Sequence, residues 1–205
     1  MPNRQEAVLL AGMAFDWLRR MLGATPTLAL VSNVLGASLE SVSRQLSQAG
    51  VNHALIGGIA VAVHGFRRAT FDLDLLVDDA KEPTVNDIML GLGFTNIQRS
   101  KVFSNYALGR LRVDFMRTQG QHTQDMLVRA ETKQVGNVSI RVVRPEDIVG
   151  LKLQALENNP SRTKDLIDIQ ELVRMGHKTM DMALVREYFV LFGKEAQLDG
   201  ILKAL

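Results

Sequence analysis

The sequence predicts an α+β fold, in which a small mixed sheet is flanked by helices between helical N- and C-terminal parts. Two observations predict it. Residues 51–144 contain short runs in which apolar and polar residues alternate, as in half-buried strands, whereas the flanking segments repeat apolar residues at helical spacing. We expect one compact unit with three parts: a helical cap at 1–50, a mixed core at 51–144 and a C-terminal helical part at 145–205 packed on the core.

The composition excludes several classes of protein. The chain has 205 residues, of which 46% are hydrophobic, enough to bury one good core. It has no cysteine, which excludes disulfide scaffolds, thiolate zinc sites and cysteine nucleophiles, and a reducing, cytoplasmic location is expected. The net charge of +2 does not by itself indicate nucleic-acid binding. No stretch is long and apolar enough to cross a membrane, so we expect no membrane partner.

Helices are expected before the core. Ala7–Leu22 has helical spacing and is followed by Gly23 and Pro26, which we expect to break the helix. Leu39–Leu46 lies in another helix, and Gly50 ends it as a C-terminal cap. This region contains no recognisable chemistry, so a cap over the core is expected, with a partner-binding helix as the alternative.

The pattern of residues 51–144 predicts short strands and helices, and that of residues 145–205 predicts further helices. Strands are expected at His53–Ile56, Thr70–Val77, Asn105–Leu108, Leu111–Met116 and Val138–Val143, and short helices at Ile59–His64 and Val85–Leu92. The strands Asn105–Leu108 and Leu111–Met116 are expected to form a hairpin. Pro145 begins a helix that ends near Glu157, since proline is favoured in the first helical position. A second helix is expected over Thr163–Met175, and more helix over Asp181–Leu205.

Three aspartates on polar strand faces are the main chemical feature. Asp72 and Asp74 alternate with apolar residues, so they share one strand face with Thr70 and lie roughly 6–7 Å apart along the backbone. Asp114 occupies the polar face of a second alternating strand. Such acids repel one another when ionised, and hard oxygen ligands suit Mg²⁺ or Mn²⁺. The three carboxylates would complete a two-metal site; the simpler interpretation is two solvated acids on an exposed strand.

Two glycines and an arginine precede the acid pair. Gly57 and Gly58 predict a tight turn between a strand and a helix, where backbone N–H groups can approach a phosphate. Arg68 lies four residues before Asp72 and suits either a triphosphate or a carboxylate. A turn without any ligand is the alternative interpretation of the glycines.

A lysine interrupts an apolar helical stripe. Lys152 falls between Leu151 and Ala155 on the face expected to be buried, where an ammonium group requires a partner. A nucleotide phosphate is one candidate, and the acids of the next helix, Asp165 and Asp168, are the other. Extension of the ammonium group to solvent is the simpler alternative.

Together these segments resemble a known group of enzymes. The run Ile56–Val77, the later strand Arg112–Met116 and the segments Arg144–Leu153 and Arg162–Asp168 resemble the nucleotidyltransferase superfamily, with its polymerase beta-like fold. They look closest to bacterial AbiEii-like toxin nucleotidyltransferases and uncharacterised relatives. The resemblance covers about residues 51–175. This chain departs from it in one respect, since many members carry a hydroxyl residue at the glycine turn.

The resemblance implies an enzyme that moves a nucleoside monophosphate from a nucleoside triphosphate to an acceptor hydroxyl and releases pyrophosphate. The acceptor would be an RNA end (tRNA-like), a protein or a small molecule, and the chain would be one component of a toxin–antitoxin pair. Asp72, Asp74 and Asp114 would hold Mg²⁺ or Mn²⁺, and Asp114 would help deprotonate the acceptor. The residues implied in nucleotide binding are Gly57, Gly58, Arg68, Thr70, Asp165 and Asp168, with Lys152 in a catalytic role.

Two other functions remain open from the sequence. One is a catalytically inactive, partner-binding protein on the same fold; the intact acid trio argues against it. The other is a metal-dependent nuclease that uses the same carboxylates. The glycine turn and Lys152 fit triphosphate binding better.

Overall fold

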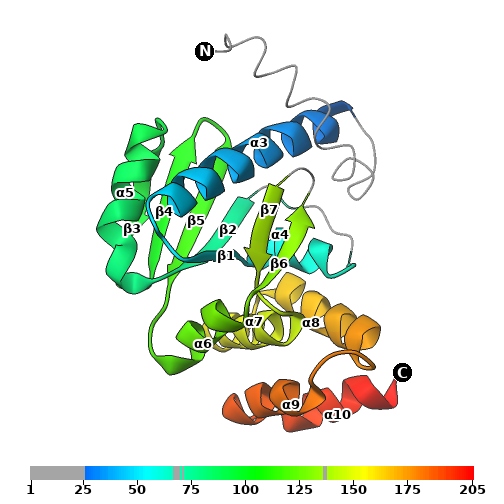
Figure 1. Ribbon diagram of the computed structural model, residues 1–205. Helices are drawn as coiled ribbons and strands as arrows, with labels where there is room; N and C mark the ends of the chain where they lie inside the picture. The colour runs from blue at the N-terminus through cyan, green and yellow to red at the C-terminus, as the bar shows by residue number, and fades with distance from the viewer. Residues whose placement is uncertain (1–25, 67–69, 71, 136–137) are drawn as a thin grey trace.

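The computed structural model describes residues 26–66, 70, 72–135 and 138–205, with side chains from residue 34 on (Figure 1). The helix expected over Ala7–Leu22 lies outside these residues, and so does Arg68. None of the described helices is both long enough and apolar enough to cross a membrane.

A seven-stranded mixed sheet forms the centre of the described chain, as expected for an α+β fold. Its strands, in spatial order, are β3 (Thr95–Arg99), β4 (Phe103–Leu108), β5 (Leu111–Arg117), β2 (Asp72–Val77), β1 (His53–Leu55), β7 (Val138–Val142) and β6 (Glu131–Val135). β2 runs parallel to β5 and β1 parallel to β7, while the other neighbours are antiparallel. The predicted hairpin is confirmed as β4 and β5.

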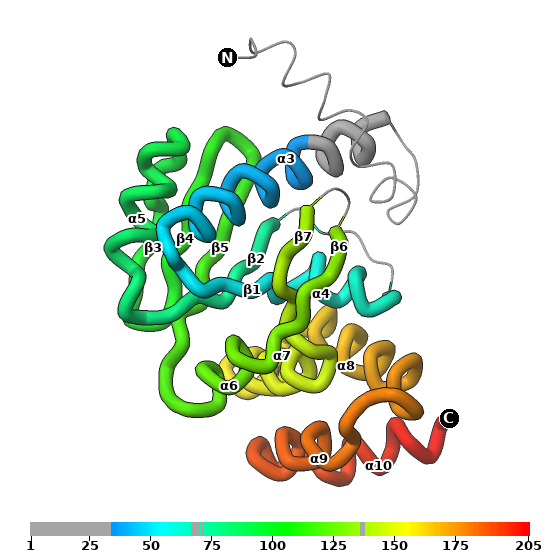
Figure 2. The backbone as a smooth tube through the Cα atoms, in the orientation of Figure 1, coloured from blue at the N-terminus to red at the C-terminus, as the bar shows by residue number. Residues whose placement is uncertain are grey.

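Helices surround this sheet. In chain order they are α3 (Pro26–Gln48), α4 (Gly57–Val63), the 3₁₀ helix η1 (Asp79–Lys81), α5 (Glu82–Gly91), α6 (Gln121–Arg129), α7 (Pro145–Asn158), α8 (Thr163–Gly176), α9 (Met182–Leu191) and α10 (Glu195–Lys203). α3 packs on β1, β2 and β7, and α7 packs on α4, α8 and α9. Figure 2 follows the chain from β7 directly into α7, which leads to the helices of the C-terminal part.

Helix α3 is longer than its sequence pattern predicted. It includes the expected segment Leu39–Leu46 but begins at Pro26, which is therefore its first residue and not a break. Proline fits there because the first helical N–H needs no intrahelical acceptor. The helix buries apolar residues every three or four positions, including Leu35 and Leu39. The chain then turns at Gly50, whose φ is 65°, as expected for a C-terminal cap.

Strand β2 has the alternation that the sequence predicted. Leu73 and Leu75 are fully buried, whereas Asp72 is exposed and Asp74 is partly buried on the other face. Burying one leucine side chain contributes about 1.5–3 kcal/mol. A slip of one residue would exchange these faces and bury the acids, so the apolar alternation fixes the register that presents the aspartates.

Four of the described elements were not predicted, and some of the predicted ones begin at other residues than expected. Strands β3 and β6, helix α6 and the 3₁₀ helix η1 have no counterpart among the predicted elements. The short helix after β1 was expected at Ile59–His64 but begins at Gly57, so both glycines belong to its first turn. The two helices expected after Pro145 are confirmed as α7 and α8.

Candidate active site

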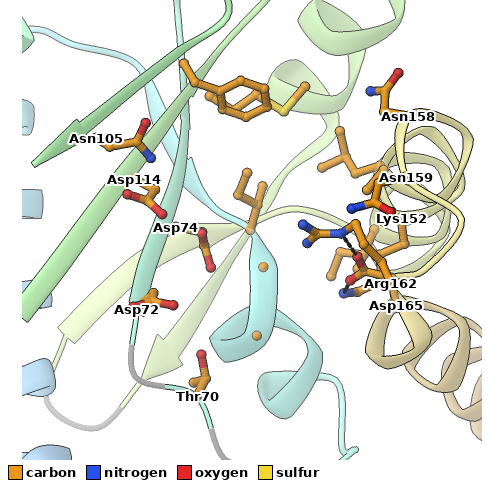
Figure 3. Close-up of a pocket in the computed structure, with 18 residues that line it drawn as sticks. Thr70, Asp72, Asp74, Asn105, Asp114, Lys152, Asn158, Asn159, Arg162 and Asp165 are labelled. Carbon is orange, nitrogen blue, oxygen red and sulfur yellow. Dashed lines mark hydrogen bonds and ion pairs between the residues drawn. The ribbon is translucent and has the colours of Figure 1, made fainter. Parts of the chain in front are cut away.

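The three aspartates come together on two adjacent strands. Because β2 and β5 are parallel, Asp74 lies directly beside Asp114, and Asp72 lies one strand repeat away on the same face. All three line a cleft of ≈ 540 Å³ between the sheet and helices α7 and α8 (Figure 3). The three acids therefore lie on one face of the sheet, as the alternation of apolar and polar residues indicated. The alternation did not specify the register of β2 against β5.

Burial and mutual repulsion change how these acids titrate. The pKa of Asp74 is raised to about 7, mainly by burial and then by the charges of Asp114 and Asp72, against a hydrogen bond from the Gly58 backbone N–H. Burial also raises the pKa of Asp114, and Asp72 adds to this rise, while a hydrogen bond from Asn105 opposes it. The cluster therefore carries more negative charge than its surroundings offset.

The glycines at the start of α4 make room for this carboxylate. Gly57 has a φ of 66°, and a Cβ added there would lie 2.0 Å from Asp74 Oδ2. That separation is far inside van der Waals contact, and positive φ is itself unfavourable for other residues. From the sequence, both glycines were expected to approach a phosphate; in the structure Gly57 allows close approach of Asp74, and the Gly58 N–H is directed to the same carboxylate.

Lysine 152 lies on the helical wall of the cleft and is buried. Its Nζ is 2.7 Å from Asp165 Oδ1 and 2.6 Å from Asp168 Oδ2, so the ammonium has the carboxylate partners that α8 was expected to supply. Asp165 also accepts a hydrogen bond from Arg162 Nε. Burial raises the pKa of Asp165, but the hydrogen bonds and charges of Lys152 and Arg162 outweigh it and leave the pKa below 3.8. These groups form an ion-pair network across α7 and α8.

The remaining predicted site residues divide between the cleft and its surroundings. Thr70, Gly57 and Gly58 line the cleft, whereas Asp168 is buried behind Lys152 and is not among the lining residues. Arg68 lies outside the described residues, so its role stays a prediction from the sequence.

The cleft also contains polar residues that were not predicted from the sequence. Asn105 is the cross-strand partner of Asp114 in the β4–β5 hairpin, so the hairpin's register could have indicated it. Arg162, Asn158 and Asn159 come from the end of α7 and the loop before α8. The loop residues follow no periodic pattern, and the only signal for Arg162 was its place in the segment that carried the resemblance. Phe103 of β4 and Met116 of β5 form a more apolar part of the cleft on its sheet side.

The acid trio fits a hard divalent cation in its chemistry. Among the described residues, no three His, Cys, Asp or Glu side chains are already arranged to hold a metal ion. Asp72, Asp74 and Asp114 nevertheless lie on one strand face, and their repulsion is what a cation would relieve. Holding an ion would require these side chains to rotate toward a common point in the cleft.

Solved structures that are similar to this chain have the nucleotidyltransferase fold. The solution structure of the antibiotic-resistance factor ANT(2″)-Ia is 14% identical, with a TM-score of 0.59 over 82% of this chain and 96% of that one. Its crystal structure with adenylyl-2″-tobramycin is also 14% identical, with a TM-score of 0.56 over 77% of this chain and 96% of that one. An antigenic nucleotidyltransferase-like protein from Paracoccidioides brasiliensis is 17% identical, with a TM-score of 0.53 over 84% of this chain and 94% of that one. At these identities the likeness shows the fold, and the predicted nucleotidyltransferase fold is confirmed.

Comparison of the sequence with families gives the assignment. No curated protein sequence matches the chain. Residues 36–205 match the model of a family described as nucleotidyl transferase of unknown function (DUF2204). The match spans the cleft, the sheet and all helices after α3. The chain thus belongs to this family of nucleotidyl transferases, an enzyme class that agrees with the superfamily its sequence resembles.

Proposed function

We propose that the chain transfers a nucleoside monophosphate from a nucleoside triphosphate to an acceptor hydroxyl, with Mg²⁺ or Mn²⁺ at Asp72, Asp74 and Asp114. The observation that carries this proposal is the register of β2 and β5, which sets Asp74 beside Asp114 within one cleft. Three carboxylates there have little structural purpose, because they repel one another and Asp74 is partly buried. A bound divalent cation would supply charge neutralisation for the acids and the triphosphate.

The residues of the sheet side have distinct parts in the proposed reaction. The acceptor oxygen attacks the α-phosphorus, the bond from that phosphorus to the bridging oxygen breaks, and pyrophosphate leaves with the bonding electrons. Asp114, whose pKa is raised by burial, accepts the proton of the acceptor hydroxyl. Asn105 donates a hydrogen bond that holds this carboxylate in place. Catalysis by positioning and electrostatics is typical of such transfers.

The helical wall supports the reaction from the other side of the cleft. We propose that Asp165 and Asp168 act through Lys152, because both carboxylates already bind its ammonium group. Two of the three N–H donors of Lys152 are engaged by these carboxylates. The third would be available to a ligand in the cleft, which Lys152 lines. Thr70 and Gly58 line the phosphate side of the proposed site, beside Asp72.

The acceptor class is proposed more broadly. ANT(2″)-Ia has been crystallised with adenylyl-2″-tobramycin, an adenylylated small molecule. That complex supports a small molecule as one acceptor, beside an RNA end or a protein hydroxyl. The AbiEii-like placement and the toxin–antitoxin role stay predictions from the resemblance. Growth arrest on expression of the chain, relieved by the product of a neighbouring gene, would support that role.

One experiment distinguishes the three functions considered. The full chain is incubated with Mg²⁺, cell extract and each of the four nucleoside triphosphates, labelled in turn at the α- and the γ-phosphate. The proposal expects acceptor labelling from the α-position and none from the γ-position. Cleavage of nucleic acid without label transfer would indicate a nuclease, and neither result would indicate an inactive, partner-binding protein. The mobility of the labelled product on gels identifies the acceptor class.

A further inference from the structure

Arginine 162 lies opposite the three aspartates. It is the residue immediately before α8, it lines the cleft, and its side chain is 54% exposed. Its Nε donates to Asp165 Oδ2, an interaction that anchors the guanidinium on the helical wall. Figure 3 shows the guanidinium directed from that wall into the space that faces Asp74 and Asp114. The side chain is therefore anchored at Nε and open to the cleft at its far end.

The two cations of this wall differ in how fully they are neutralised. Lys152 is buried and contacts two carboxylates at 2.7 and 2.6 Å. Arg162 shares Asp165 with it, and within the described residues no hydrogen bond is found for its two terminal amino groups. Because a guanidinium presents a planar fork of donors, these two groups suit a ligand with paired oxygens.

We infer that Arg162 binds the polyphosphate of the nucleoside triphosphate across the cleft from the acids, and that Asp165 is its positioning residue. The inference rests on the proposed function. A polyphosphate placed against three carboxylates requires positive charge on its other side as well, and phosphate oxygens accept two parallel N–H bonds from arginine. The sequence suggested Arg68 and Lys152 for phosphate contacts, and both stay predictions; the geometry adds Arg162, which the sequence did not single out.

The test measures binding and does not require the acceptor. Calorimetry in Mg²⁺ compares wild type with Arg162→Ala and Arg162→Lys for three probes: inorganic tripolyphosphate, a nucleoside triphosphate and the corresponding nucleoside. Arg174→Ala is the matched control, because Arg174 is 57% exposed on the same helix and pairs with Glu171 three residues away. Arg174 is outside the cleft-lining residues. Thermal melts establish that each variant is folded.

Arg162→Ala is expected to weaken tripolyphosphate and triphosphate binding about 10- to 100-fold and to leave nucleoside binding unchanged. Arg162→Lys should fall between, since it keeps the charge but loses the fork, and Arg174→Ala should match wild type. If Arg162→Ala binds the triphosphate as tightly as wild type, or loses nucleoside affinity as much as triphosphate affinity, the assignment of Arg162 is overturned and the proposed function is not. Failure of the wild-type chain to bind any triphosphate would overturn the proposed function together with it.

Discussion

The carboxylate of Asp74 occupies the space in which a side chain on Gly57 would begin. A Cβ at Gly57 would lie 2.0 Å from Asp74 Oδ2 and 2.5 Å from Cγ. The first turn of α4 and the acid of β2 are therefore packed against each other without any side chain between them. Since α4 follows β1 directly, the glycine ties the geometry of the acids to the central strands of the sheet.

The first prediction concerns this contact. Gly57→Ala should lower stability and displace Asp74, because the new methyl group meets the carboxylate and the φ of 66° is unfavourable for alanine. Gly50→Ala is the matched control: Gly50 has a φ of 65° but open space where the Cβ would stand. We expect a loss of about 1 kcal/mol for Gly50→Ala and a larger one for Gly57→Ala in urea denaturation. Equal losses of unfolding free energy in the two variants would show that the contact between Gly57 and Asp74 adds nothing to the cost of the substitution.

The second prediction concerns pH in the presence of a chelator. The pKa of Asp74 is raised from 3.8 to about 7, chiefly by burial and then by Asp114 and Asp72. The unfolded chain therefore releases this proton at lower pH than the folded chain, so the free energy of unfolding should fall as the pH rises from about 4 to about 7. Asp74→Asn cannot ionise and should remove most of this fall.

The control for this pH series is the exposed residue Asp87 on α5. Asp87→Asn should retain the wild-type dependence of stability on pH, measured by urea denaturation at each pH. Saturating Mg²⁺ should also flatten the wild-type curve if the cation offsets the ionised acids. A wild-type curve that rises from pH 4 to 7 in chelator, with Asp74→Asn unchanged from it, would contradict the repulsion described for the cleft.

The third prediction separates structure from catalysis at Lys152. Lys152→Met removes the cation shared by Asp165 and Asp168 and should cost about 3–5 kcal/mol, as expected when one partner of a buried ion pair is lost. Lys194→Met is the control, because Lys194 pairs with the exposed Glu157 and should change stability by at most about 1 kcal/mol. Greater stability in Lys152→Met, with activity abolished, would instead indicate a lysine whose burial serves catalysis.

Much of the site could be predicted because its residues follow local patterns. Asp72, Asp74 and Asp114 each interrupt a strand of alternating apolar residues, which sets their faces without any knowledge of distant contacts. Lys152 was selected because it interrupts an apolar helical stripe, and its two carboxylate partners follow from the spacing of α8. These are features of strand and helix periodicity.

The rest of the fold lacked such patterns. All five residues of β3 are exposed, and only Val135 of β6 is buried, so neither strand shows apolar alternation. Helix α6 buries only Thr123, Met126 and Leu127, which is too few for a clear helical stripe. These elements depend on pairing and packing with segments that are distant in sequence, and such contacts override weak local preference.

The remaining site residues depended on long-range geometry. The parallel register that pairs Asp74 with Asp114 joins residues 40 positions apart, and no local pattern specifies it. Arg162 is a half-exposed loop residue, and the role we infer for it depends on its place in the assembled cleft. For Gly57 the sequence predicted a tight turn, but the partner that needs the glycine, Asp74, comes from a neighbouring strand.

We propose that the three aspartates hold the metal ion that binds the nucleotide, and one calorimetric comparison tests this proposal. Binding of a nucleoside triphosphate is measured with Mg²⁺ and with chelator, for wild type and for the Asp72→Asn, Asp74→Asn double variant. We predict Mg²⁺-dependent binding in wild type and its loss in the double variant, which should remain folded and gain stability in chelator because the repulsion is removed. Unchanged Mg²⁺-dependent binding in a folded double variant would contradict the assignment of these carboxylates.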